Sequence, residues 1–382
     1  MKNIALFCDG TWQNLSQSVP TNVARLARSL APQAPQTPGA EPCEQLVYYN
    51  DGVGVGQGVL NAATRVIGGG LGEGLDEKIM HAYEFLCLNY SAGDRIFIFG
   101  FSRGAYTARS LAGLLRKCWI VRRENASETD RALDLYRNGS LDSPEVRKFK
   151  EEFCHPAEPF VGGRASDPVA AAQVLNDDRT YWGHVQYVGV WDTVGSLGIP
   201  KTLPFAPDFN AKYRFHDTSL SRFVLSARHA VSIDERRATF APTLWDNIDE
   251  LNSNAGAEKV PYGRRPYQQN WFPGHHAGVG GGDDDGGLSI MPLLWIAEGA
   301  EMAGLGLNHA TLNRPPSANC CAPFVRAKPS LANLLIRAIG QRDRDGPGTL
   351  FEISDAARTR WNSVRDYRPR PLTRFADKLG PD

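Results

Sequence analysis

The chain has 382 residues, with 42 lysines and arginines against 42 aspartates and glutamates, so its formal net charge is zero. Hydrophobic residues make up 42% and charged residues 22%, which is ordinary globular composition and excludes an intrinsically disordered chain. The balanced charge argues against a general nucleic-acid binder, and no apolar run approaches the roughly 18 residues of a membrane span. Many α/β folds of this length form one unit, so we expect a single domain over residues 1–382.

The cysteines and the N-terminal segment indicate a cytoplasmic protein. The seven cysteines are odd in number and form no C-x-x-C pair, which favours thiols kept reduced over a disulfide framework. Between Lys2 and Asp9 stand Asn3 and five apolar residues, 4–8. The apolar region of a signal peptide needs about 7–15. We therefore expect a protein that is cytoplasmic where it is made, and exported, if at all, without a signal peptide.

The predicted elements alternate between strands and helices. In chain order they are a strand at 3–8, a helix at 22–30 capped by Thr21 or Asn22, a strand at 46–49, a helix at 75–90, a strand at 95–100, a helix at 104–116, a strand at 185–191, a helix at 219–231 and a strand at 268–272. Continuous apolar strands that alternate with helices are typical of a mostly parallel sheet with helices on both faces. The polar stretch 124–183 is interpreted as an insertion that forms a lid or cap.

Two glycine-rich stretches lie outside these elements. Residues 52–74 hold many glycines but no G-x-G-x-x-G and no G-x-x-x-x-G-K-[ST], so we expect no nucleotide cofactor. The second stretch, 273–287, includes Asp283-Asp284-Asp285. This run does not match the EF-hand pattern, so we expect a solvated acidic turn and no metal site.

The sharpest motif is Gly100-Phe101-Ser102-Arg103-Gly104, which matches G-x-S-x-G. It stands between a predicted strand and a predicted helix, the context of the nucleophile elbow of α/β-hydrolases. Glycines at both flanks allow the tight turn that exposes the serine hydroxyl, and the helix N-terminus favours a developing oxyanion. The motif predicts Ser102 as a nucleophile. The alternative is a tight glycine turn with an incidental serine.

A serine nucleophile needs a base and an acid that orients it, and in α/β-hydrolases the chain order is serine, acid, histidine. Asp192 directly follows the strand at 185–191 and is the predicted acid, with a simple turn or cap aspartate as the alternative. His275 and His276 lie on the glycine-rich loop after the last strand and are the preferred bases. His229 is a weaker candidate, because it falls within the predicted helix at 219–231.

The oxyanion donors are expected on backbone N–H groups. One is that of Arg103, directly after the nucleophile. The second normally comes from a loop after an early strand, and Gly10 or Thr11 on the loop after 3–8 could supply it.

These segments together resemble the bacterial type VI secretion phospholipase effectors of the first lipase-effector family, and the wider α/β-hydrolase-domain family around them. The matching segments are 8–12, 51–54, 93–96, 99–109, 190–195, 229–237, 271–276, 279–282 and 367–369. They run over nearly the whole chain and are more specific than G-x-S-x-G alone.

The resemblance implies an α/β-hydrolase core with Ser102 as nucleophile, Asp192 as acid and His276 as base. The family loop usually reads Pro-Gly-x-His-Ser-Asp-Val-Gly-Gly, but Ala277-Gly278 stand here in place of the Ser-Asp pair. That departure removes a carboxylate beside the base, which puts activity or substrate range in question.

We therefore expect a serine esterase that cleaves carboxylic esters, with phospholipid acyl chains as the substrate implied by the resemblance. A small-molecule ester or thioester is the alternative substrate, and a hydrolase-fold scaffold with little catalysis is the alternative of another class. The expected partners are the lipid or small ester and a membrane surface, and for an effector also the secretion machinery or an immunity protein. No cofactor is expected.

Overall fold

The computed structural model of the protein describes residues 1–10, 13–35, 42–52, 71–141, 143–156, 183–195, 219–284, 286–314, 316–324 and 340–380. The second predicted oxyanion donor, Thr11, lies outside these residues, as do most of the first glycine-rich stretch and Asp285.

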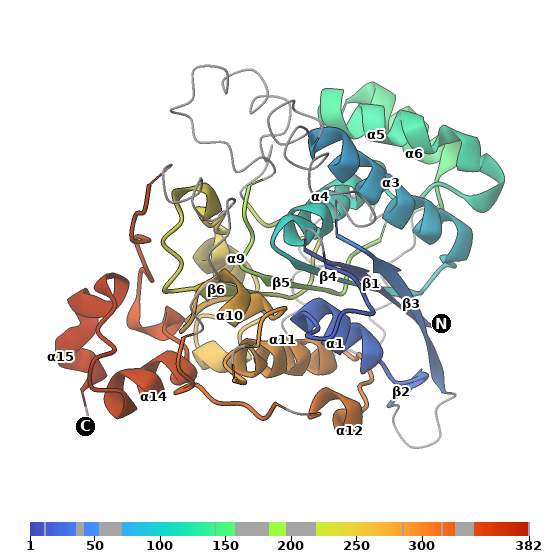
Figure 1. Ribbon diagram of the computed structural model, residues 1–382. Helices are drawn as coiled ribbons and strands as arrows, with labels where there is room; N and C mark the ends of the chain where they lie inside the picture. Colours follow the sequence, from blue (N-terminus) through green and yellow to red (C-terminus); the bar gives the residue numbers. More distant parts are fainter. Residues whose placement is uncertain are drawn as a thin grey trace.

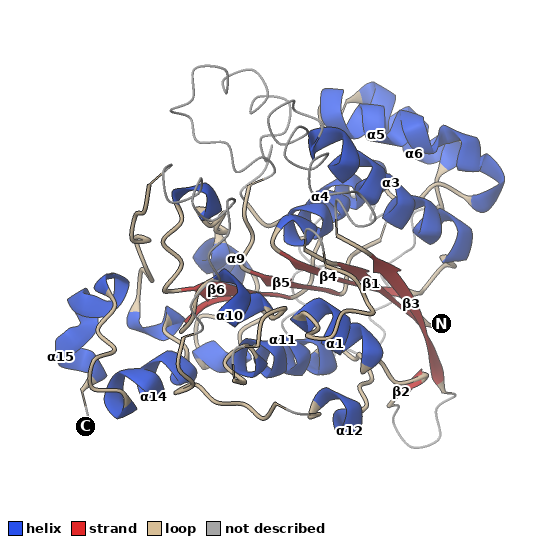
Figure 2. Cartoon of the chain, in the orientation of Figure 1, coloured by secondary structure: helices blue, strands red, loops and turns tan. Residues whose placement is uncertain are grey.

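The framework is a seven-stranded sheet in the order β2-β3-β1-β4-β5-β6-β7 (Figure 2). Its strands are β1 (Asn3–Cys8), β2 (Gln33–Ala34), β3 (Cys43–Asn50), β4 (Arg95–Phe101), β5 (Tyr187–Trp191), β6 (Ala227–Ser232) and β7 (Tyr267–Phe272). Only the short edge strand β2 pairs antiparallel, and every other pair is parallel. All six of the parallel strands therefore end at one edge of the sheet.

The α-helices are α1 (Asn22–Arg28), α3 (Leu71–Asn89), α4 (Arg103–Cys118), α5 (Thr129–Asn138), α6 (Pro144–Phe153), α9 (Ile248–Asn254), α10 (His276–Gly280), α11 (Ile290–Met302), α12 (His309–Leu312), α14 (Asp355–Ser363) and α15 (Ala376–Leu379). Short 3-10 turns are η1 (Arg123–Glu128), η2 (Ala238–Phe240), η3 (Tyr262–Arg264), η4 (Leu350–Glu352) and η5 (Arg370–Phe375).

Helices cover both faces of the sheet, with α3 and α4 on one side and α1 and α11 on the other (Figure 1). Alternate residues of each central strand enter different cores. Leu6 and Ile98 pack with α3 and α4, whereas Phe7 and Phe99 face α1 and α11 and stack with ring centroids 4.9 Å apart. β1 is buried on both faces, which matches its continuous apolar run after Asn3. The predicted α/β fold with a mostly parallel sheet is confirmed.

One predicted element is wrong. The helix predicted at 219–231 is replaced by turns and by strand β6, which includes His229. The run Leu220, Phe223, Val224 has helical spacing, but the following Ala-Arg-His-Ala-Val-Ser segment is paired between β5 and β7. Burial between two parallel neighbours overrides the local helical pattern.

The described part of the predicted insertion packs on one side of the core. Its helices α5 and α6 bury Leu135 and Phe149 in the cluster formed with α3 and α4. Residues 157–182 lie outside the described part, so the lid function of 124–183 stays a prediction.

The C-terminal elements from η4 to α15 form a third cluster at the β7 end of the sheet (Figure 1). Trp361, Tyr367 and Leu372 pack there against Val231 of β6 and Trp271 of β7. Among the described residues, no helix has the length and apolar character that crossing a membrane requires.

Candidate active site

Ser102 occupies a sharp turn between β4 and α4. Its backbone is in the left-handed region (φ 59°), and its N–H donates to the Trp191 carbonyl at 3.0 Å. A Cβ on Gly100 would lie 2.4 Å from the Gly104 carbonyl oxygen, and one on Gly104 would lie 2.1 Å from the Cys8 carbonyl oxygen. Both motif glycines are therefore required by backbone contacts, and the predicted turn is present.

The structure brings the three predicted catalytic side chains together at the carboxyl edge of the sheet. His276 Nε2 lies 2.8 Å from Ser102 Oγ, and His276 Nδ1 lies 2.6 Å from Asp192 Oδ2. Since a carboxylate can only accept, the neutral histidine carries its proton on Nδ1, and Nε2 is free to accept the serine proton. This is the geometry of a Ser-His-Asp triad.

Asp192 follows β5 and is completely buried. Its own backbone has a positive φ of 37°, and its N–H donates to the Ala230 carbonyl at 2.7 Å. Oδ1 accepts from Ser232 N–H at 2.9 Å. Arg344 also contacts both carboxylate oxygens, with Nη1 2.6 Å from Oδ1 and Nη2 2.9 Å from Oδ2. Sequence analysis missed Arg344, because nothing in its polar Arg-Asp-Arg-Asp-Gly surroundings distinguishes it from a solvated loop residue.

The buried charges set the protonation states of the triad. Burial opposes the charge of Asp192, but the Arg344 guanidinium and the His276 hydrogen bond hold the pKa of the carboxyl well below its usual range. For His276, burial is the largest influence and lowers its pKa, while Asp192 opposes that shift. A neutral imidazole beside an ionised carboxylate is the state that a general base needs.

Two aromatic rings and the Glu235 carboxylate surround His276. Phe101 packs on the His276 ring at 4.6 Å, and Phe240 meets it edge-on at 4.8 Å. Glu235, buried and paired with Arg237, accepts from the backbone N–H of His276 at 3.2 Å.

The loop that carries His276 is held from the end of β6. Asp234 accepts from Gly274 N–H at 2.7 Å and from Tyr367 OH at 3.0 Å, and burial raises the pKa of Asp234 to about 6. Carboxylates from the loop after β6 thus support the segment in which Ala277-Gly278 replace the Ser-Asp pair of the resemblance.

The other two candidate bases lie elsewhere in the hydrogen-bond network. His275 precedes α10 and its Nδ1 accepts from Gly278 N–H at 3.1 Å, so it caps that helix. His229 is completely buried in β6, where Nδ1 pairs with Gln269 Oε1 at 2.9 Å and Nε2 accepts from Thr193 N–H at 3.2 Å. The structure places neither of them at Ser102.

The predicted oxyanion donors have different surroundings. Arg103 is the first residue of α4, so its N–H has no intrahelical partner. Gly10 lies beside Ser102, since a Cβ there would lie 3.5 Å from Ser102 Cβ. The Gly10 N–H, however, donates to Asp9 Oδ1 at 2.6 Å, so the structure does not present it as a free donor. Gly10 is therefore the less favourable donor, and Arg103, Gly10 and Thr11 stay predicted donors.

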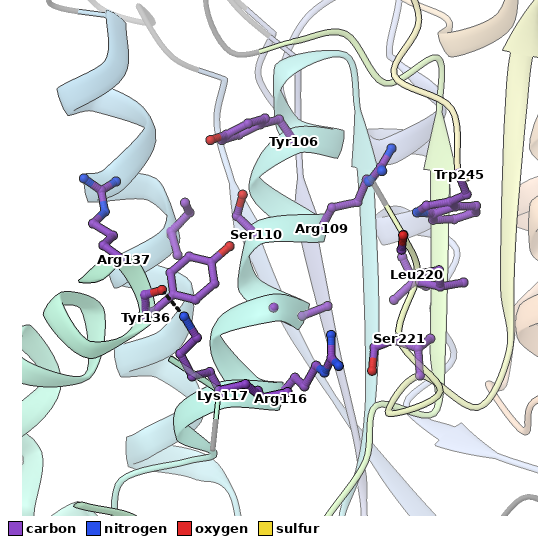
Figure 3. A pocket seen from close by; sticks show the side chains of 17 residues that line it. Tyr106, Arg109, Ser110, Arg116, Lys117, Tyr136, Arg137, Leu220, Ser221 and Trp245 are labelled. Atoms are coloured by element: carbon purple, nitrogen blue, oxygen red, sulfur yellow. Dashed lines mark hydrogen bonds between the residues drawn. The ribbon is translucent and has the colours of Figure 1, made fainter. Parts of the chain in front are cut away.

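A cavity of about 250 Å³ runs along α4, beginning one turn beyond Ser102 at Tyr106 (Figure 3). Its cations make structural contacts. Lys117 Nζ donates to the Tyr136 carbonyl at 2.6 Å, and Arg109 donates to the Thr243 carbonyl at 2.5 Å. The cavity is separate from the triad, which does not line it.

The acidic run Asp283-Asp284 lies on the loop after α10. Over the described residues, no group of three or more histidine, cysteine, aspartate or glutamate side chains is placed to hold a metal ion.

Comparison with known proteins assigns a family. The family model described as type VI secretion system phospholipase effector Tle1-like, catalytic domain, matches residues 2–299. The uncharacterized protein YEL023C of Saccharomyces cerevisiae is 30% identical over 250 residues, which are 63% of this chain and 32% of that protein. The chain thus spans about a third of that relative's length.

Two solved structures are also similar. An uncharacterized protein from Pseudomonas aeruginosa is 20% identical with a TM-score of 0.40, over 83% of this chain and 49% of that one. The Tle1 effector bound to the VgrG spike of the type 6 secretion system is 18% identical with a TM-score of 0.38, over 75% of this chain and 52% of that one. On the match of its family model over residues 2–299, the chain belongs to the Tle1-like phospholipase effector catalytic-domain family.

Proposed function

We propose that the chain is a serine hydrolase that cleaves the carboxylic esters of phospholipids. The observation that carries the proposal is the continuous hydrogen-bonded chain from Ser102 Oγ through His276 to the buried Asp192. Membership of a phospholipase effector family supports the ester as the bond that is cleaved and phospholipid as the substrate class.

In the proposed mechanism, Ser102 Oγ attacks the ester carbonyl carbon while its proton passes to His276 Nε2. Asp192 keeps the Nδ1 proton oriented toward itself and stabilises the imidazolium. The carbonyl oxygen becomes an oxyanion held by the Arg103 N–H, with the Thr11 N–H as the second proposed donor.

The imidazolium then gives its proton to the alcohol oxygen as the C–O bond breaks, which leaves an acyl-enzyme on Ser102. Water attacks the acyl carbon and passes one proton to His276 Nε2. That proton returns to Ser102 Oγ as the carboxylic acid leaves, so the enzyme is regenerated.

The experiment measures fatty-acid release from phosphatidylcholine vesicles and hydrolysis of p-nitrophenyl esters of increasing chain length. Ser102→Ala and His276→Gln should reduce kcat by roughly 10⁴-fold or more, because each removes part of a unit that acts together. His275→Asn should keep most of the activity, since an asparagine can still accept from Gly278 N–H. Ser140→Ala, at an exposed position, serves as the matched serine control.

The outcomes separate the alternatives. Vesicle hydrolysis that depends on Ser102 supports a phospholipase, whereas activity confined to short esters points to a small-molecule esterase. Full activity of Ser102→Ala would overturn the mechanism. A wild-type protein that is inert toward all of these esters would favour a binding or scaffold function.

For a phospholipase effector, we further propose delivery by the secretion machinery and an immunity protein as antagonist. Both rest on the family assignment. Co-purification of the tagged chain with a secretion spike protein from the same source would test the first of these.

A further inference from the structure

We propose that Arg344 is a positioning residue of the active site, which clamps Asp192 in the plane that aligns His276 and offsets the negative charge of the acid. The inference deepens the proposed function and rests on it. Arg344 lies beyond residues 2–299, the part of the chain that matches the family model.

The hydrogen bonds to both oxygens of the Asp192 carboxylate fix its orientation. Each Asp192 oxygen accepts one hydrogen bond from a different Arg344 nitrogen, so the planar guanidinium and the carboxylate form a bidentate pair. The remaining bond on Oδ1 comes from Ser232 N–H, and that on Oδ2 comes from His276. Rotation of the carboxylate would therefore break the bond to His276 together with both bonds to Arg344.

Arg344 is itself held rigidly. Its Nη1 and Nη2 also donate to the backbone carbonyls of Ser232 and Phe240, each at 2.8 Å. Four hydrogen bonds to a side chain that is almost completely buried leave it little freedom.

The segment that carries Arg344 is docked on the loop after β6. Arg342 N–H donates to the Arg236 carbonyl at 2.8 Å, and Asp343 pairs with the Arg236 side chain at 2.8 Å. Gly346 has a positive φ of 82°, and a Cβ there would lie 2.6 Å from the Pro371 carbonyl oxygen. The turn after Arg344 thus fits closely against the C-terminal cluster.

The charges around the triad predict the direction of a pH effect. Asp192 faces Arg344, His276 and the neutral, buried His229, while His276 also faces Glu235 and, through it, Arg237. Without the Arg344 charge, nothing would offset the negative charge of Asp192 to the same degree. The imidazolium of His276 would then be stabilised more strongly, and the pKa of His276 would rise. As the pH falls, His276 would then become protonated, and unable to accept the serine proton, at a higher pH than in the wild type.

The test compares Arg344→Gln, Arg344→Lys and the exposed Arg342→Gln as the matched control. For each folded protein we measure kcat, KM and the pH dependence of kcat/KM with a soluble p-nitrophenyl ester. Arg344→Gln should lower kcat by about 10- to 100-fold, with KM nearly unchanged. It should also raise the pKa of the acid limb by roughly one to two pH units. Arg342→Gln should match the wild type.

Arg344→Lys separates charge from geometry. It keeps the positive charge but not the planar fork, so the acid limb should return to within about half a pH unit of the wild type while kcat stays reduced. If Arg344→Gln does not fold, the lysine variant decides, because a wild-type kcat for it would overturn the positioning function.

A folded Arg344→Gln protein with the wild-type acid limb would also overturn the inference, even if its melting temperature fell. Such a result would leave the proposed function intact as long as Ser102→Ala is inactive. Activity in Ser102→Ala would refute the proposed function whatever Arg344 does, so the two failures are distinguishable.

Discussion

The replacement Gly104→Ala tests whether the nucleophile turn depends on close contact between α4 and β1. The added Cβ would lie 2.1 Å from the Cys8 carbonyl oxygen and 2.5 Å from that of Asp9. Since ordinary contacts of this kind are at least about 3 Å, α4 would have to move away from β1 by about 1 Å. Both neighbours are backbone atoms of a central strand or of the residue after it, so neither can rotate away.

The expected cost follows from that movement. Overpacking of this kind typically destabilises a protein by about 1–3 kcal/mol, and the rigidity on both sides places Gly104→Ala near 3 kcal/mol. Ser102 is only two residues from Gly104, and a misplacement of about 1 Å at a reacting atom can reduce kcat about 100-fold. Stability and activity should therefore fall together.

The assay combines urea unfolding with kcat for a p-nitrophenyl ester, normalised to the serine labelled by a fluorophosphonate. Gly263→Ala is the matched control, because a Cβ there meets no atom within 4 Å. The reasoning is refuted if Gly104→Ala unfolds within about 0.5 kcal/mol of the wild type, the range of a neutral surface change, and keeps its kcat.

Three further changes address buried ionisable side chains. Asp192→Asn should lower kcat by roughly 10³–10⁴-fold and destabilise the fold by about 3–5 kcal/mol, since it leaves Arg344 buried without its counter-charge; kinetics and urea titration check both. Glu235→Gln removes a negative charge facing His276 and should shift the acid limb of kcat/KM to lower pH, opposite to Arg344→Gln; an unshifted limb would contradict this. His229 is buried, and burial lowers its pKa to about 3, so below about pH 6.5 only the unfolded state binds its proton and stability falls. His229→Gln should therefore reduce the slope of unfolding free energy against pH between about pH 6.5 and 3 by up to about 1.4 kcal/mol per pH unit, and an unchanged slope in urea titrations at several pH values would refute the assignment.

The nucleophile turn could be predicted from the sequence because its signal is local. Ser102 is flanked by two glycines that backbone contacts require, and an apolar strand precedes it. Asp192 could be placed for a similar reason, at the end of the buried run of β5. The predicted helix at 219–231 failed because the spacing of Leu220, Phe223 and Val224 is local, whereas the pairing of β6 with two other strands is not.

The remaining parts of the site depend on contacts between distant segments. His275 and His276 are adjacent, and their own spacing does not distinguish them. In the folded chain, His276 contacts Ser102 and Asp192, whereas His275 accepts from Gly278 N–H. Arg344 lies 152 residues after Asp192 and has no motif of its own. Its contact with Asp192 exists only when the segment at 340–346 docks on the loop after β6.

That separation along the chain has a consequence for synthesis. Ser102 and Asp192 leave the ribosome before His276, which follows Ser102 by 174 residues, and Arg344 comes later still. At roughly 5–20 residues per second, Arg344 is made about 8–30 s after the acid that it contacts. A nascent chain therefore passes through this interval with Ser102 and Asp192 already made and Arg344 absent, so the proposed clamp on Asp192 can form only after Arg344 has been synthesised.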